Sequence, residues 1–170
     1  SSDFDISDAT FSIGNNIVQC NITDIQHTTI AGPDNTYPSL LVDQTVSFTG
    51  LVTVVGLANS PNSCFVSSID GSPYCGISVY NPNTLSRIGD EVEITGLVKE
   101  FHGFTQIFEP ELEILSSGNS LPEPIDVSTG DLILPANAEA FEGSLIRVNN
   151  VTISKDVDDF NQWYVDDGSG

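Results

Sequence analysis

Apolar and polar residues alternate along most of the chain, and the alternating stretches end in Gly, Asn, Asp or Pro. A period of two places successive side chains on opposite faces of a β-strand, and helical periodicity is nearly absent. The pattern predicts five strands in succession, over residues 44–56, 63–70, 75–81, 89–103 and 104–116. These stretches indicate an all-β protein.

Glycine interrupts the first and fourth predicted strands near their centres, at Gly50 and Gly96. A glycine inside a long strand often marks a bulge or bend, which lets one strand serve two sheets or a barrel corner. The second and third strands flank Asp-Gly-Ser-Pro and form a predicted hairpin, and the connector after them is too short for a full helix. This order of strands predicts a five-stranded Greek-key barrel of the OB type.

A second, incomplete set of strand signals follows the barrel. "EGSLIRVNNVTISKD" at 142–156 resembles the first barrel strand, and "NQWYVDDGSG" at 161–170 resembles "SCFVSSIDGS" at 63–72. This internal repeat predicts a second OB-like β unit of which only two strands are present. The predicted organisation is an N-terminal strand-like extension over 1–21, an OB-fold barrel over 22–117, a linker rich in Pro, Gly and Ser over 118–141, and the partial second unit over 142–170.

Before the first strand, "TDIQHT" predicts one helical turn, with Thr23 or Asp24 as its cap.

The charge of the chain is strongly negative, with 4 Lys and Arg against 24 Asp and Glu and a net charge of −20 over 170 residues. Nucleic-acid affinity depends on cations that displace the counterions of phosphate groups. We therefore expect the chain alone to be a poor binder of nucleic acid. A neutral glycan is a more compatible ligand.

Composition also bears on location. The chain contains no Met, three Cys, few Lys and many Thr, Ser, Asn and Gly, which favours an extracellular protein. Its first residues suit a mature protein without its signal segment, and a fragment boundary explains them equally well. No apolar run approaches the roughly 20 residues that span a bilayer, so no membrane insertion is expected.

Several stretches resemble a known family: "ITDIQHTT", "IGDEVEITGLVKEFHGFTQI", "LPEPIDVSTGDL" and "FEGSLIRVNNVTIS". They are similar to tandem OB-fold modules of secreted bacterial proteins, found in multidomain surface proteins and beside the catalytic domain of some extracellular nucleases. The resemblance extends from about Ile22 to Gly170 and implies an extracellular or cell-surface location. It supplies no catalytic residues, and the chain departs from the family in its cysteines and in the segment before Ile22.

The three cysteines leave their pairing open. Cys64 and Cys75 bracket the predicted hairpin, and a bridge between them is the favoured interpretation. With the turn centred near Gly71, however, Cys75 lies opposite Ser68, and a bridge needs Cα atoms within about 7 Å. Cys20 is then unpaired or bonded to another molecule.

No pattern points to catalysis. The two histidines, His27 and His102, lie far apart without metal-ligand spacing, and the sequence has no Gly-x-Ser-x-Gly. Acidic pairs at strand spacing, such as Glu91 with Glu93 and Glu109 with Glu111, are typical of exposed strand faces. The sequence therefore predicts a non-enzyme.

Two weaker ligand sites are candidates. Turns rich in oxygen ligands suit Ca²⁺, and the residues concerned are Asp156, Asp158, Asp166 and Asp167. Aromatic residues on strands can stack on a base or a sugar, and the candidates are Phe65, Tyr80, Phe101 and Phe104. The alternative interpretations are solvated turns and core aromatics.

The incomplete second unit suggests the function. A half-barrel leaves strand edges unpaired, and an exposed edge is a template for another chain. The predicted inter-subunit edges contain Phe11 and Ile13 near the N-terminus, and Trp163 and Val165 near the C-terminus. We expect a secreted structural protein that assembles with copies of itself into a fibre or surface layer by β-strand donation. The alternative is a ligand-binding OB module, for glycan or nucleic acid, from a larger secreted protein such as a nuclease or adhesin.

Overall fold

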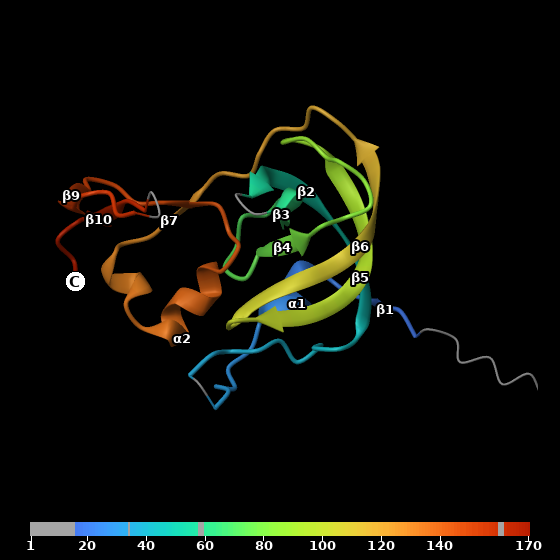
Figure 1. Cartoon of the computed structure of the whole chain (residues 1–170), viewed down its shortest axis with the longest axis horizontal. Coiled ribbons are helices and arrows are strands. Elements are labelled where there is room, and N and C mark those ends of the chain that lie inside the picture. The colour runs from blue at the N-terminus through green and yellow to red at the C-terminus, as the bar shows by residue number, and fades with distance from the viewer. Residues whose placement is uncertain (1–15, 34, 58–59, 160–161) are drawn as a thin grey trace, which may run out of the picture.

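A computed structural model describes residues 16–33, 35–57, 60–159 and 162–170 (Figure 1). All five barrel strands predicted from the alternating pattern are present. They are β2 (Thr45–Leu57), β3 (Ser60–Ser67), β4 (Gly76–Tyr80), β5 (Glu91–Phe101) and β6 (Phe104–Ser116).

These five strands form a closed barrel. Going around it, β2 is followed by β3, β4, β6 and β5, and β5 pairs with β2 again. The β4–β6 pair is parallel and the other four pairs are antiparallel. A barrel whose first strand pairs with both the second and the fourth, and whose third pairs with the fifth, has OB topology, so the predicted fold class is confirmed.

Strand β2 pairs with two partners because it bends near Gly50. Its first half, from Thr45 to Leu51, pairs with β5, and its second half, from Leu51 to Leu57, pairs with β3. A Cβ on Gly50 would lie 2.5 Å from Cγ1 of Val66, so the bend leaves no room for a side chain. A register shift in β5 likewise falls between Thr95 and Leu97, at Gly96. Both predicted interruptions are therefore points where the barrel turns.

Residues 18–26 close one end of the barrel. Strand β1 (Val18–Gln19) pairs in parallel with β2, and helix α1 (Ile22–Gln26) follows it. The N-cap is Asn21 rather than the predicted Thr23 or Asp24, and the backbone N–H of Asn21 donates to Asp24 Oδ2 at 2.8 Å. Ile22 and Ile25 are buried in the barrel core. The described connector between β4 and β5 contains no helix, so α1 supplies the apolar plug instead.

The core consists of inward-facing residues from every barrel strand and from α1. It is almost entirely aliphatic, with one phenylalanine and one cysteine, and comprises Ile22, Ile25, Val46, Phe48, Val52, Cys64, Val66, Ile77, Val79, Val92, Ile94, Val98, Ile107 and Leu112.

The chain after the barrel, residues 125–170, is called the C-terminal unit here. It lies beside the barrel near β3 and β4 (Figure 1). Its elements are β7 (Ile125–Asp126), η1 (Gly130–Leu132), α2 (Pro135–Ala138), η2 (Glu139–Phe141), β8 (Ile146–Arg147), β9 (Thr152–Lys155) and β10 (Tyr164–Asp166). Strand β7 pairs in parallel with β8, and β9 pairs antiparallel with β10. The predicted linker thus contains β7 and three short helices, and the predicted strand over 142–156 is divided into β8 and β9.

Candidate functional site

The aromatic candidates lie on neighbouring barrel strands but form separate pairs. Phe65 of β3 meets Phe104 of β6 edge to face, with ring centroids 6.0 Å apart. Tyr80 of β4 stacks on Phe108 of β6 at 5.4 Å and 12°. Phe101 contacts the ring of His102 at the β5–β6 turn. The four predicted aromatics therefore do not form one platform.

Part of the barrel face at β3 is covered by the C-terminal unit. Residues 143–145 and Phe65, together with Thr53 and Val54, line a pocket of about 230 Å³. This volume is below the roughly 300 Å³ at which small-molecule sites begin. Phe65 therefore lies against the protein's own chain on one side.

Three of the four cations are engaged within the chain. Lys99 pairs with Asp43 at 2.5 Å, and Arg147 lies 3.5 Å from Glu123 and 3.7 Å from Asp126. The Lys155 ammonium lies 4.4 Å from the centre of the Tyr164 ring.

Three carboxylates meet where the C-terminal unit contacts the barrel. Glu100 is on β5, Glu139 is in η2 and Glu142 follows η2. Thr105 of β6 binds two of them: its backbone N–H donates to Glu142 Oε1 at 3.0 Å, and its hydroxyl donates to Glu100 Oε1 at 2.6 Å. The backbone N–H of Ser39 also donates to Glu100 Oε1, at 3.0 Å.

Burial and mutual repulsion favour the protonated forms of two of these groups. Desolvation, together with the charge of Glu100, raises the pKa of Glu139 to about 7. Desolvation, with smaller effects of Glu139 and Glu100, raises the pKa of Glu142 to about 8, against the opposing hydrogen bond from Thr105. Carboxylates with perturbed pKa values beside a pocket are typical of functional sites, and they also occur at structural contacts.

Two of these carboxylates, Glu139 and Glu142, border a pocket at this junction. Its volume is about 350 Å³, and Glu139 and Glu142 line it from one side and His102 and Tyr37 from the other. Sequence patterns gave no signal for this cluster, because Glu100 is on a strand and the other two lie in a segment that resembles a linker. Only the packing of the C-terminal unit brings them together.

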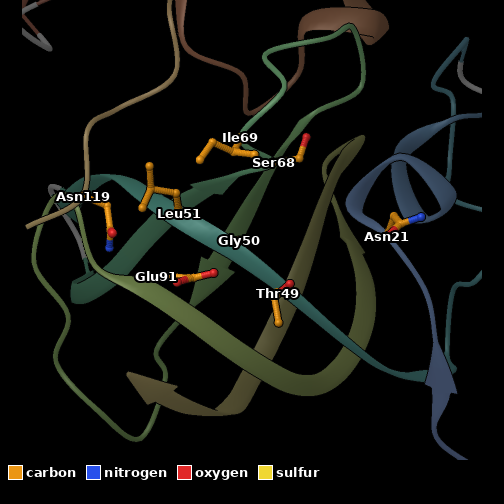
Figure 2. Close-up of a pocket in the computed structure, with 8 residues that line it drawn as sticks. All are labelled: Asn21, Thr49, Gly50, Leu51, Ser68, Ile69, Glu91 and Asn119. Carbon is orange, nitrogen blue, oxygen red and sulfur yellow. The ribbon is translucent and has the colours of Figure 1, made fainter. Parts of the chain in front are cut away.

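A second pocket lies between the middle of β2, the end of β3 and the start of β5, and Figure 2 shows its lining residues. It measures about 260 Å³. Two of its polar side chains already have partners: Asn119 Nδ2 donates to the Gly89 carbonyl, and Glu91 Oε2 accepts from Ser116 Oγ.

The predicted Cys64–Cys75 bridge is wrong for this structure, in which all three cysteines are free. Cys64 lies opposite Val79 in the β3–β4 pair, and the carbonyl of Cys75 accepts from the backbone N–H of Ser68. At about 3.3 Å per residue the four-residue offset corresponds to about 13 Å, well beyond the reach of a disulfide. The expected register of Cys75 against Ser68 is confirmed, and it is the reason why the bridge does not form.

The four aspartates predicted to bind Ca²⁺ are not brought together. Asp158 lies at the loop end of the β9–β10 hairpin, where it accepts from the Tyr164 hydroxyl, whereas Asp166 lies opposite Thr152 at the other end. In the described residues, no group of three or more His, Cys, Asp or Glu side chains is placed to hold a metal ion. Calcium would need six to eight oxygen ligands at one point.

Asp167 instead fixes a turn. Its carboxylate accepts from the hydroxyl of Thr129 at 2.5 Å and from the hydroxyl and backbone N–H of Ser169 at 2.6 and 3.0 Å. These hydrogen bonds, that from Ser169 first, lower its pKa. Asp156 is exposed.

The β9–β10 hairpin carries the predicted C-terminal edge residues. Val165 lies directly opposite Ile153, and their exposed fractions are 43% and 61%. Trp163, just before β10, is 65% exposed. Among the described strands, neither β9 nor β10 has a second neighbour. Phe11 and Ile13, the predicted N-terminal edge residues, lie outside the described residues.

Comparisons with known proteins bear on the fold alone. No protein-family model and no curated protein sequence matches the chain. A structure of a replication protein A heterotrimer bound to ssDNA is similar at 17% identity and a TM-score of 0.42, over 61% of this chain and 84% of the other. OBody AM1L10 bound to hen egg-white lysozyme is similar at 25% identity and a TM-score of 0.37, over 46% and 84% of the two chains. Because both TM-scores are low, the assignment of the OB fold rests on strand order.

No helix within the described residues is both long and apolar enough to cross a membrane.

Proposed function

We propose that this protein is a secreted, non-catalytic structural protein that assembles with copies of itself by β-strand donation, into an extracellular fibre or a surface layer. The observation that carries the proposal is the β9–β10 hairpin, whose two outer edges pair with no other described strand and whose apolar side chains are exposed. A lone two-stranded hairpin is marginally stable in water, and a third strand would satisfy its backbone and cover its apolar side chains.

The strand that it receives is proposed to come from the N-terminal segment of a neighbouring copy. Phe11 and Ile13 alternate with polar residues in that segment, as a donated strand requires. Main-chain hydrogen bonds would supply the affinity, and alternate side chains would lie beside Ile153 and Val165 on the same face. Since donor and acceptor are different surfaces, each contact leaves one of each free, and assembly continues head to tail.

The composition and the exposed acidic strand faces suit a secreted location. The resemblance of the sequence to OB modules of bacterial surface proteins points the same way. The engaged cations argue against a nucleic acid as the partner, because few positive charges remain to meet phosphate groups.

The acceptor surface is tested by I153K with V165K, which places two charges on the apolar side of the hairpin. We expect the wild-type chain to form particles or fibres that grow with concentration, and the double variant to remain monomeric by analytical ultracentrifugation and electron microscopy. L85K, at another exposed apolar position, is the matched control and should assemble normally. A monomeric wild-type chain at high concentration would refute the proposal.

A mixing experiment tests the head-to-tail geometry. F11K with I13K removes the donor and leaves the acceptor intact, whereas I153K with V165K does the reverse. Each double variant alone should be monomeric, and an equal mixture should give a heterodimer that grows no further. Growth of the mixture into larger particles would contradict a single donor–acceptor contact.

The stacked Tyr80–Phe108 pair favours a second candidate function, the binding of a neutral glycan. Both rings are 37% exposed on the outside of β4 and β6, and aromatic faces stack on sugar rings. Saturable glycan binding by a chain that does not self-associate would favour this function over assembly.

A further inference from the structure

Residues 139–144 attach the C-terminal unit to the barrel, and we call them the junction segment. Four hydrogen bonds cross this contact. They run from Tyr74 N to Ala140 O at 2.6 Å, from Thr105 N to Glu142 Oε1 at 3.0 Å, from Gln26 Nε2 to Glu142 O at 3.5 Å and from Cys75 Sγ to Ser144 Oγ at 3.6 Å. The donors belong to four places on the barrel: the end of α1, the β3–β4 turn, the residue before β4, and β6.

The backbones themselves touch at two glycines. A Cβ on Gly76 would lie 2.1 Å from the carbonyl oxygen of Gly143, so no side chain fits between the two segments. The side chain of Gln26, 2% exposed, also donates to the carbonyl of Gly76 at 2.7 Å. The junction is therefore a close, specific contact rather than a loose one.

This close contact also brings like charges together. Glu100 belongs to the barrel, whereas Glu139 and Glu142 belong to the junction segment, and Thr105 donates to one carboxylate from each side. When all three are ionised, their repulsion opposes the contact that the hydrogen bonds favour.

Little positive charge compensates for these carboxylates. Lys99, the neighbour of Glu100 in β5, pairs with Asp43. Of the described residues that line the adjoining pocket, His102 is the only basic one, and Tyr37 is the other titratable residue outside the junction segment. His27 contacts the ring of Tyr74 edge to face, at a centroid distance of 4.8 Å.

We propose that the junction segment is a pH-sensitive latch, which holds the C-terminal unit on the barrel in mildly acidic conditions and releases it as the pH rises. Release would uncover the barrel surface beside Phe65, which residues 143–145 now adjoin. The latch does not depend on assembly, because all of its contacts lie within one chain.

The direction follows from proton linkage. The pKa values of Glu139 and Glu142 are raised to about 7 and about 8 in the closed latch, from 4.5 for a free glutamate. The closed form therefore binds more protons than the open form, and its stability is greatest at acidic pH. As the pH rises from about 4.5 to the raised pKa of each group, ionisation of that group increases the equilibrium constant for opening by up to about tenfold per pH unit. Above about pH 8 this equilibrium constant no longer changes.

Amide hydrogen exchange of the full chain tests the latch, because the amides of Tyr74 and Thr105 donate to the junction segment. E142Q removes the charge of Glu142 but keeps a side-chain oxygen that can accept from Thr105. E139Q removes the charge of a side chain that accepts no hydrogen bond from the barrel among the described residues. Dividing the wild-type rate by the variant rate at each pH cancels the intrinsic pH dependence of exchange.

We expect this ratio at both amides to rise at least about tenfold between about pH 6 and about pH 9. E113Q, an exposed carboxylate on β6, should retain the wild-type pH dependence. If E142Q does not fold, E139Q alone tests the latch. The rise in its rate ratio is then the part that Glu139 contributes. A ratio that stays constant with pH in both variants would overturn the latch.

Discussion

The three thiols show how burial sets the chemistry of single residues. Cys64 is fully buried in the barrel core, and loss of solvation raises its pKa to about 11. Cys75 is 1% exposed and hydrogen-bonded, whereas Cys20 is half-buried. Burial and the charge of Asp24 also raise the pKa of Cys20, but its sulfur is the most accessible of the three.

Alkylation of the native chain should therefore label Cys20 first. Iodoacetamide near pH 8, followed by peptide mass spectrometry, should modify Cys20 at least about tenfold faster than Cys64, because only the thiolate reacts and it must be reached. In denaturant all three should react at similar rates. Equal labelling in the native chain, or a modification-resistant Cys64–Cys75 pair that becomes reactive only after reduction, would contradict the described packing.

Among the secondary-structure elements, α1 has a role larger than its five residues suggest. It places two isoleucines in the end of the barrel, where the connector between β4 and β5 supplies no helix. Residues 18–26 are thus part of the barrel, because strand β1 continues the sheet beside β2 and α1 packs into the core.

I25A should destabilise the barrel by about 2 to 5 kcal/mol, because it removes a fully buried side chain from a packed core. I30A makes the same substitution at a position that is 62% exposed, and should lower the free energy of unfolding by less than about 0.5 kcal/mol. Urea unfolding followed by circular dichroism measures both. Similar midpoints for the two variants would mean that α1 does not plug the barrel.

Elements that are recognised from neighbouring residues in the sequence could be predicted. Alternation located all five barrel strands, and Gly50 and Gly96 indicated where two of them bend. The cap of α1 was placed two or three residues late because Asn21, Thr23 and Asp24 are all good N-cap residues. The helices of 130–141 were missed because short turns with Pro and Gly carry no helical period.

The candidate sites were harder to predict because they depend on contacts distant in sequence. Four aspartates close in sequence were separated by the hairpin, and two cysteines that bracket a turn were offset by its register. The carboxylate cluster joins Glu100 to residues some forty positions away, through a junction that no spacing rule describes.

For the whole molecule, the net charge of −20 opposes the proposed assembly. Copies of a strongly acidic chain repel one another, and salt screens this repulsion over a distance that falls from about 30 Å at about 0.01 M to about 8 Å at about 0.15 M. The apolar contacts of the hairpin are little affected by this change in salt.

Self-association should therefore strengthen with salt over that range. Light scattering of the wild-type chain should show larger particles at about 0.15 M than at about 0.01 M sodium chloride. The I153K and V165K double variant serves as the control, since it should stay small at both. Weaker association at higher salt would indicate that attraction between opposite charges, rather than strand addition, holds the copies together.

The double pairing of β2 has a consequence for how the chain folds. The β2–β3, β3–β4 and β5–β6 pairs each join neighbours in sequence, and they can form early as local hairpins. The β2–β5 pairing, which brings Thr45 opposite Leu97, requires closure of a loop that contains the whole β3–β4 hairpin. Non-local pairings of this kind are slow because the entropy of loop closure is lost before the contacts form. Barrel closure at β2 should thus limit the folding rate, and until it occurs the first half of β2 presents an open edge to other chains.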